Sequence, residues 1–173
     1  MKRIFGKILM LFPVCIILLM VGASLNKRSK AEEAAEKIRR LPLLTMTDIY
    51  GKPFSTANLT SGPLLITFFH PDCEFCKFEI SSLLAIDDIS AKFIIVLVSY
   101  ADTAEIISFA KQLGITDSSG FSILHDPYLE YSNMFGAEMI PSNYIYDDSL
   151  RLVKVFKGSV RPETILKYIN DND

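Results

Sequence analysis

The chain is poor in cysteine and histidine, with three cysteines and two histidines in 173 residues. Cys15 lies inside an apolar N-terminal run, where we interpret it as a membrane-buried residue. The remainder of the chain holds only Cys73 and Cys76, too few for a disulfide-stapled scaffold. A zinc site would ordinarily need two more ligands, and the sequence has no second C-x-x-C and no H-x-x-x-H. This scarcity favours a functional dithiol and predicts no metal site.

Basic residues are also scarce over most of the chain. Residues 41–173 carry nine Lys and Arg against seventeen Asp and Glu, a net charge of −8, whereas residues 26–40 have a net charge of +3. Binding of nucleic acid needs a basic face that can meet phosphates. The charge distribution therefore disfavours a nucleic-acid partner.

An apolar run at residues 8–25 dominates the N-terminus. Its 18 residues carry no charge and follow Lys2, Arg3 and Lys7, and a run of this length can span a bilayer. We expect a retained signal anchor that crosses a bacterial inner membrane once, with the N-terminus inside. The small residues at 21–23 (VGA) resemble a cleavage site, so a cleaved signal and a secreted domain are the alternative.

Three parts follow from this pattern: a transmembrane segment at 1–25, a polar stalk at 26–40, and a folded domain at 41–173 on the extracytoplasmic, periplasmic side. Within the domain, apolar runs of strand length alternate with segments of helical period. The expected elements are a β-hairpin at 41–59, strands at 64–69, 91–99, 121–126, 142–147 and 150–158, and helices at 76–90, 103–113, 126–135 and 161–170.

This order predicts an α/β thioredoxin-like fold, a central mixed sheet flanked by helices. It has an N-terminal β-hairpin and a strand–helix insert before the final hairpin. The C-x-x-C of Cys73 and Cys76 falls where an apolar strand leads into a helix. The free N–H groups and the positive dipole end of a helix N-terminus stabilise a thiolate, so a reactive thiol pair is expected there.

Three segments carry a family resemblance that spans nearly all of residues 41–170: the strand, C-x-x-C and helix at 64–80, the run GAEMIPSNYIYD at 136–147, and the VFKG of the last strand at 155–158. Together they resemble the membrane-tethered, extracytoplasmic thioredoxin-like proteins of the TlpA/ResA type, within the redoxin (AhpC/TSA-like) group. The resemblance implies thiol–disulfide oxidoreductase activity, with the Cys73–Cys76 disulfide as the redox group and no other cofactor.

The resemblance also implies roles for single residues. Cys73 would attack, Cys76 would resolve, and Pro141 would follow a cis peptide that faces the pair. Glu79 stands where the ResA-like branch has an acid, and it could accept the proton of the resolving thiol. A solvated helix acid is the alternative for Glu79.

The sequence departs from the family pattern at three positions. Asp72 replaces the common Trp before the first cysteine, and Phe75 replaces the common Pro before the second. Thr67 stands where thioredoxin has a buried strand acid, and a hydroxyl cannot act as that base. If a base exists near Cys76, Glu79 or a water must supply it.

Several neighbours are candidates for substrate binding. The Ile140 main chain could pair with an extended client segment, and Phe75, Met139 and Pro71 could form an apolar rim around the dithiol.

Both histidines have two interpretations. His70 could lower the Cys73 pKa or shuttle a proton, although a capping or packing role explains it as well. His125, near a strand end, is more simply a packing residue.

We expect a monomer that reduces disulfides in client proteins such as apocytochromes and is re-reduced by a membrane thiol donor. The acids Asp72, Glu74 and Glu79 disfavour a thiolate, and this predicts a reducing couple rather than a strong oxidant.

Other functions stay open. A peroxiredoxin-like peroxidase would want Thr at the position of His70. A copper module of the Sco kind would want C-x-x-x-C and a distant His, for which His125 is the candidate. A purely structural disulfide is the last alternative.

Overall fold

The computed structural model describes residues 32–33, 35–59 and 62–170. The chain divides into a unit at Met1–Glu36 and a compact unit at Lys37–Asp173, and the second contains all the strands described below. Within the described residues, none of the helices is long and apolar enough to cross a membrane. The predicted anchor at 8–25 and its Cys15 lie outside the described residues and stay predictions.

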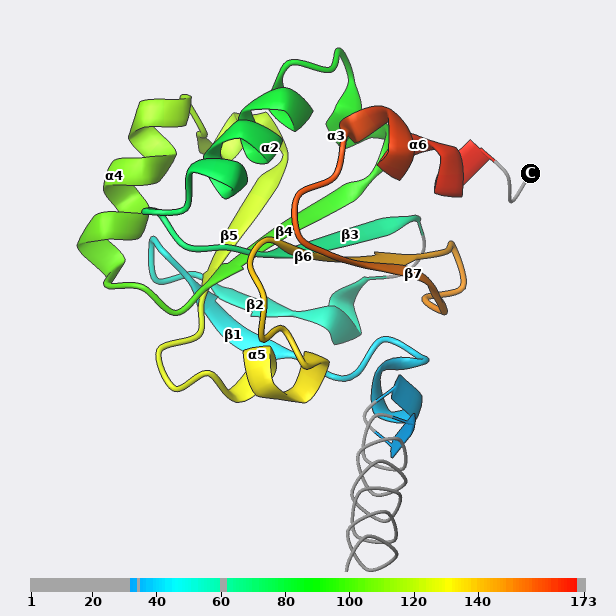
Figure 1. Cartoon of the computed structure of the whole chain (residues 1–173). Coiled ribbons are helices and arrows are strands. Elements are labelled where there is room, and N and C mark those ends of the chain that lie inside the picture. The colour runs from blue at the N-terminus through cyan, green and yellow to red at the C-terminus, as the bar shows by residue number, and fades with distance from the viewer. Residues whose placement is uncertain (1–31, 34, 60–61, 171–173) are drawn as a thin grey trace, which may run out of the picture. The chain divides into compact units, whose positions relative to one another are not determined.

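A mixed sheet of seven strands forms the centre of the compact unit, in the order β2-β1-β5-β4-β3-β6-β7 (Figure 1). β3, β4 and β5 are parallel, while β1, β6 and β7 join their neighbours in antiparallel pairs. The strands are β1 Thr45–Asp48, β2 Pro53–Ser55, β3 Leu64–Phe68, β4 Ile94–Ser99, β5 Phe121–His125, β6 Ser142–Tyr146 and β7 Leu152–Lys157. The predicted thioredoxin-like order of elements, with its hairpin at β1–β2 and its β5–α5 insert, is confirmed.

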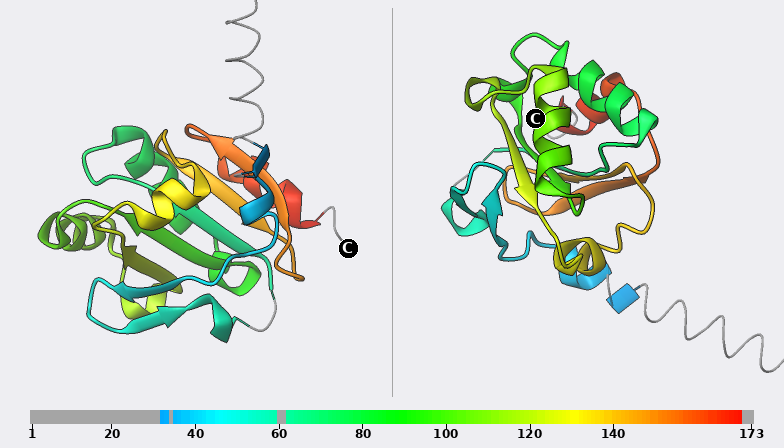
Figure 2. Two further views of the ribbon diagram at one scale, coloured as in Figure 1. Left: turned by 90° about the horizontal axis from the view of Figure 1, so that it is seen from below. Right: turned by 90° about the vertical axis from the view of Figure 1, so that its left-hand side faces the viewer.

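Helices cover both faces of the sheet. Figures 1 and 2 show α2, α4 and α6 on one face and α5 on the other. The helices are α2 Glu74–Leu84, α3 Ile89–Lys92, α4 Thr103–Leu113, α5 Glu130–Phe135 and α6 Pro162–Asn170, with 3-10 turns η1 Thr56–Asn58 and η2 Asp117–Ser119.

Alternation along β3 divides the core in two. Leu65 points into the cluster that contains Ile80 of α2 and Ile165 of α6, whereas Leu64 and Ile66 belong to the cluster on the α5 side. All residues of β3 are buried, because the strand is covered on both faces. Each fully buried Leu or Ile contributes about 1.5–3 kcal/mol to folding, so β3 is a well-fixed base for the loop that follows it.

Two helices differ from their predicted limits. The predicted helix at 76–90 begins two residues earlier, at Glu74, and α2 ends at Leu84 with Ala85 as its C-cap. Asp88, in a left-handed conformation with φ 56°, separates this end from the next helix. The short α3 then forms separately, and β4 begins only at Ile94. The expected helix at 126–135 is shortened to α5, because the buried Asp126 carboxylate accepts the N–H groups that open the helix.

The compact unit begins at Lys37, four residues before the predicted boundary at Leu41. Ile38 is buried in the α5-side cluster, and its carbonyl accepts the Tyr146 hydroxyl proton at 2.9 Å. Arg40 forms a β-bridge with Arg151. The last residues of the predicted polar stalk therefore pack on the sheet.

Two glycines in left-handed conformations give a matched test of the α3 packing. Gly114 has φ +70° and open space at its missing Cβ, whereas a Cβ on Gly120, with φ +75°, would lie 2.3 Å from Ser90 Cβ. We expect Gly114→Ala to lower the free energy of unfolding by about 1–2 kcal/mol, which is the cost of placing a residue with a Cβ in a left-handed conformation. Gly120→Ala should lower it further, because the new Cβ would also collide with Ser90. Urea unfolding of both variants measures the difference, and equal losses would contradict the close contact with α3.

Candidate active site

Cys73 and Cys76 form a disulfide at the start of α2, with their Cα atoms 5.2 Å apart. Cys73 is the N-cap residue of the helix, with φ −86° and ψ 105°, and Cys76 lies in the first turn. β3 leads into this point through the segment after Phe68. The structure thus brings together the two thiols that the sequence predicted to act as a pair.

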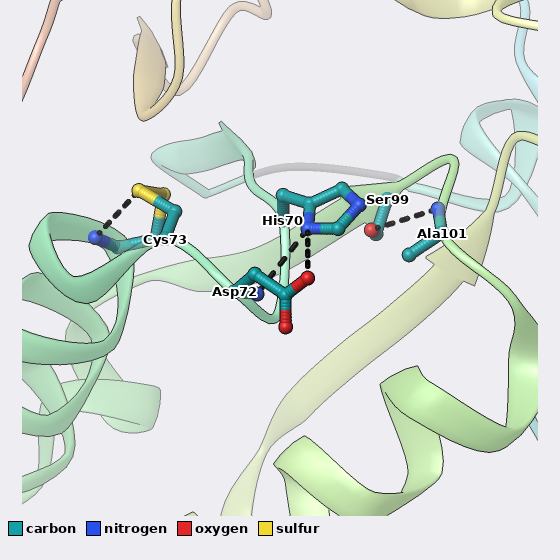
Figure 3. Close-up of polar contacts among 6 residues, drawn as sticks. His70, Asp72, Cys73, Ser99 and Ala101 are labelled. Atoms are coloured by element: carbon teal, nitrogen blue, oxygen red, sulfur yellow. Dashed lines mark hydrogen bonds and ion pairs between the residues drawn. A yellow bond between two sulfur atoms is a disulfide. The ribbon is translucent and has the colours of Figure 1, made fainter.

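The turn before Cys73 is organised by His70. The His70 carbonyl accepts the Cys73 N–H at 3.0 Å, and the His70 Nδ1 atom accepts the Asp72 N–H at 3.2 Å. Figure 3 shows the imidazole turned away from the disulfide, toward the side of Ser99, and its ring contacts Tyr100 at 5.3 Å between centroids. His70 therefore has the capping and packing role in this oxidised state, and it stands where the peroxidase alternative would want a threonine.

The two sulfurs have different surroundings. Cys73 is partly exposed, and its Sγ accepts the Cys76 N–H at 3.1 Å, whereas Cys76 is completely buried. A thiolate on Cys73 would keep this N–H and the helix N-terminus as partners. Cys73 is therefore the partly exposed member of the pair, and Cys76 is the buried one.

Glu79 is completely buried, one turn after Cys76 on α2. Asn143 Nδ2 donates to its Oε1 at 2.8 Å, and the Val160 N–H donates to its Oε2 at 2.6 Å. Burial raises the pKa of the Glu79 carboxyl above its ordinary value, and hydrogen bonds from Val160, Asn143 and Ser159 only partly offset this. The alternative of a solvated helix acid is wrong.

Asn143 is a polar residue of the site that the sequence analysis missed. It is fully buried on β6, and its Oδ1 accepts the Thr67 hydroxyl proton at 2.7 Å. Thr67 and Asn143 are direct partners in the β3–β6 register. The available signal was an amide just before the apolar and aromatic residues 144–146 of β6, two residues after Pro141.

The Ile140–Pro141 peptide bond is cis, as predicted. The Pro141 carbonyl accepts the Gly158 N–H at 2.8 Å, and the Ser142 hydroxyl donates to the Met139 carbonyl. Ile140 and Cys73 both pack against the hydrophobic cluster on the α2 side of the sheet. The cis-proline loop is therefore held by β6 and β7 on the same side of the molecule as the dithiol helix.

Exposed apolar side chains occur on both elements of the site. Phe75 on α2 is 70% exposed and Met139 in the cis-proline loop is 54% exposed, in line with the predicted rim, while Pro71 is half-buried. Phe78 is 66% exposed and was missed, although its position one turn after Phe75 is the sequence signal. Isolated exposed hydrophobic side chains are common, but several of them on the dithiol helix and the cis-proline loop suit binding of a protein segment.

A groove of about 320 Å³ lies beside the cis-proline loop. Its lining includes Tyr100, which contacts His70, and Ile140, which precedes the cis bond. Leu129 and Ala137 add apolar surface, and Glu138 adds an acid. The groove therefore lies between the loop before Pro141 and Tyr100, whose ring contacts the turn before the cysteines.

His125 lies elsewhere, on β5, where its Nδ1 is 3.3 Å from the Thr103 hydroxyl. It lines a different groove, against β1 and α5. In the part of the chain that the structure describes, no three His, Cys, Asp or Glu side chains are grouped to hold a metal ion. His125 thus packs against neighbouring elements, as the simpler interpretation predicted, and its position gives no support to the copper-binding alternative.

A disulfide closed across the first turn of a helix that follows a central strand, with a cis proline opening the antiparallel strand alongside, defines a thioredoxin-like thiol–disulfide oxidoreductase. More specifically, the AhpC/TSA family model matches residues 38–155, and the chain belongs to this family. No curated protein matches the sequence.

Solved structures share the fold at low sequence identity. A secreted Mycobacterium tuberculosis disulfide oxidoreductase homologous to E. coli DsbE matches with a TM-score of 0.62 and 20% identity, over 77% of this chain and 96% of that one. A thiol:disulfide interchange protein of the thioredoxin family from Chlorobium tepidum matches with a TM-score of 0.65 and 20% identity, over 76% of this chain and 94% of that one. The exposed lipoprotein thioredoxin of Streptococcus pneumoniae matches with a TM-score of 0.63 and 16% identity, over 75% of this chain and 98% of that one.

The buried Glu79 predicts a pH-dependent stability. A carboxyl whose pKa is raised by folding holds its proton more tightly in the folded state, so its contribution is present at low pH and is lost as the pH rises through the folded-state value. We expect the free energy of unfolding of the oxidised protein to fall above the ordinary carboxyl range, by at most about 1.4 kcal/mol per pH unit.

Urea unfolding over a pH series measures this slope. Glu79→Gln should remove the part of this slope that comes from Glu79. Glu105→Gln, at an exposed position on α4, should leave the slope unchanged. An unchanged slope in Glu79→Gln would show that another group is responsible.

Proposed function

We propose that this protein is a membrane-tethered, extracytoplasmic oxidoreductase that reduces disulfides in client proteins through Cys73 and Cys76. The observation that carries the proposal is the asymmetry of the pair. Cys73 is partly exposed at the start of α2, whereas Cys76 is buried in the same disulfide. A structural disulfide has no need of an exposed attacking side.

The first step uses the reduced protein. The Cys73 thiolate attacks one sulfur of a client disulfide, a bond forms between Cys73 Sγ and that sulfur, and the other client sulfur leaves as a thiolate. The Cys76 N–H and the N-terminus of α2 stabilise the Cys73 thiolate before attack. This step stores the client as a mixed disulfide on Cys73.

The second step releases the client. Cys76 gives its proton to the Glu79 carboxylate and attacks Cys73 Sγ, and the remaining client sulfur leaves as a thiolate. The client gains two electrons, and the protein returns to the disulfide seen in the structure. Glu79 suits the transfer because it lies on the same helix face as Cys76, three residues on, and is equally buried.

The charges around the pair support a reducing direction. Asp72 and Glu74 are exposed acids on either side of Cys73, and Glu79 lies behind Cys76. Negative charge and burial both disfavour thiolates, and strong oxidants depend on a stabilised thiolate in their reduced form. The reduced protein is therefore expected to give up its electrons readily.

A client segment would bind between the two elements that carry exposed apolar groups. Ile140 main-chain groups could pair with an extended client strand. Phe75 and Met139 would flank the client disulfide, and the groove at Tyr100 would take a neighbouring client side chain. Apocytochromes are one class of client that offers such a disulfide in an unfolded segment.

The apolar run at 8–25 supports a membrane tether, which would place the domain outside the cytoplasm. Two of the similar structures come from a secreted and an exposed protein, which is compatible with this location. Re-reduction of the disulfide needs a dithiol donor, and a membrane protein is the class of donor that can carry electrons to that side.

Substitution of the resolving cysteine tests the proposal directly. Cys76→Ser should stall the reaction after the first step and accumulate a mixed disulfide on Cys73, identified by mass spectrometry after exposure to cell extracts. Cys73→Ser should trap nothing, because the accessible nucleophile is lost. Absence of any trapped protein with Cys76→Ser would contradict client reduction.

The predicted direction can be measured as a reduction potential. We expect a value nearer to that of thioredoxin, about −270 mV, than to that of DsbA, about −120 mV. Replacing Asp72 and Glu74 by Asn and Gln should raise the potential, because it stabilises the thiolate form, while Glu105→Gln on α4 should leave it unchanged. Alkylation of the protein in dithiothreitol and glutathione buffers gives the values, and a potential near that of DsbA would refute the reducing assignment.

A further inference from the structure

We propose that Thr67 and Asn143 are positioning residues that keep Glu79 ionised and oriented to take the Cys76 proton. They form a hydrogen-bond chain from β3 through β6 to α2. The inference rests on the proposed function, because it concerns the base of the second step. It assigns a role to two buried residues that belong neither to the dithiol nor, in the proposed mechanism, to the surface that binds the client.

The chain consists of two short hydrogen bonds between completely buried groups. The Thr67 hydroxyl donates to Asn143 Oδ1 at 2.7 Å, and Asn143 Nδ2 donates to Glu79 Oε1 at 2.8 Å. Both donors therefore point in one direction, from the sheet toward the carboxylate. Hydrogen bonds in such a chain polarise and strengthen one another in a medium of low dielectric.

Ionisation of Glu79 fixes the direction of the whole chain. An ionised carboxylate only accepts, so the Asn143 amide must turn its N–H groups to Glu79 and its oxygen to Thr67. The Thr67 hydroxyl must then donate. Loss of this hydroxyl leaves a buried carbonyl oxygen without its donor, and an amide that rotates to escape this would present its oxygen to the carboxylate. Both effects disfavour the ionised form of Glu79.

The other contacts of Glu79 are also hydrogen bonds. The Val160 N–H and the Ser159 side chain, both in the segment before α6, form hydrogen bonds with the Glu79 carboxyl. Among the described residues, no charged side chain contributes to the shift in its pKa, and the titratable neighbour on its own helix is Cys76. Neutral donors alone must therefore offset the cost of burying the charge.

The Thr67 hydroxyl is not needed to fill space in the strand. β3 is buried along its whole length, and Val at this position would fill the same space. The hydroxyl bonds across to the register partner of Thr67 on β6, which is the residue that contacts Glu79. Thr67 occupies the strand position where thioredoxin has its acid, and here it acts on an acid supplied by α2.

The test compares Thr67→Val, which removes the hydroxyl at nearly constant shape, with Thr67→Ser, which keeps it. The oxidised protein is labelled with carbon-13 in its Glu carboxyls, and the Glu79 signal is assigned with Glu79→Gln and titrated by NMR. In this state the cysteines do not titrate. We expect Thr67→Val to raise the titration midpoint by about one pH unit, a tenfold change in the ionisation constant, and Thr67→Ser to restore it.

A kinetic measurement on the reduced protein checks the link to Cys76. Reaction with 5,5′-dithiobis(2-nitrobenzoate) first places thionitrobenzoate on Cys73, and attack by Cys76 then releases it with a change in absorbance. The midpoint of the pH profile of the second phase should rise in Thr67→Val by the same amount as the Glu79 titration. In the Glu79→Gln background, Thr67→Val should produce no such shift.

Two results would overturn the inference: an unchanged or lowered Glu79 midpoint in Thr67→Val, or an equal kinetic shift with and without Glu79. If Thr67→Val does not fold, Asn143→Leu removes the next donor of the chain and should raise the midpoint in the same sense. Failure of client reduction would leave these titrations intact, so the proposed function and this inference fail separately.

Discussion

The pairing of β3 with β4 on one side and β6 on the other is the constraint on which the site depends. β3 delivers the chain to the turn before Cys73, and antiparallel pairing of Phe68 with Ser142 brings Pro141 to the same edge of the sheet. A shift of one residue in this register would turn every side chain of β6 to the opposite face. Asn143 would then face away from α2, and the polar contact with Glu79 would be lost.

Sequence patterns were sufficient for the parts of the fold that depend on local signals. Apolar runs identified the buried strands, and the C-x-x-C at 73 and 76 identified the dithiol. Sequence patterns failed where tertiary contacts determine the limits of a helix or the burial of a side chain. Asp126 shortens α5 by capping it through its buried side chain, and nothing in the local period shows this. The Glu79 carboxyl accepts the N–H of Val160, a residue far along the chain, and no local pattern predicts this contact, so the helix position of Glu79 alone allowed a solvated acid.

Glu79 illustrates how a buried acid can be tolerated next to a reactive pair. Removing a carboxylate from water without partners would cost several kcal/mol, and here both oxygens accept short hydrogen bonds. These bonds do not cancel the cost of burial, so the pKa of the group stays raised. A carboxyl held between these opposing effects is closer in proton affinity to a thiol than an exposed acid would be, and this is what a proton acceptor for Cys76 requires.

The placement of this acid on α2 has a mechanical consequence. Cys73, Cys76 and Glu79 lie on one rigid helical segment, so helix geometry fixes the spacing of the groups that the proposed mechanism uses as nucleophile, resolving thiol and base. An acid on β3 would depend instead on the packing of α2 against the sheet. In the proposed mechanism the sheet still contributes through the Thr67–Asn143 contact, which adjusts the proton affinity and the orientation of the base, while α2 sets its distance from the thiol. In the proposed mechanism, client binding at the exposed rim can therefore vary without changing the proton transfer in the buried part of the site.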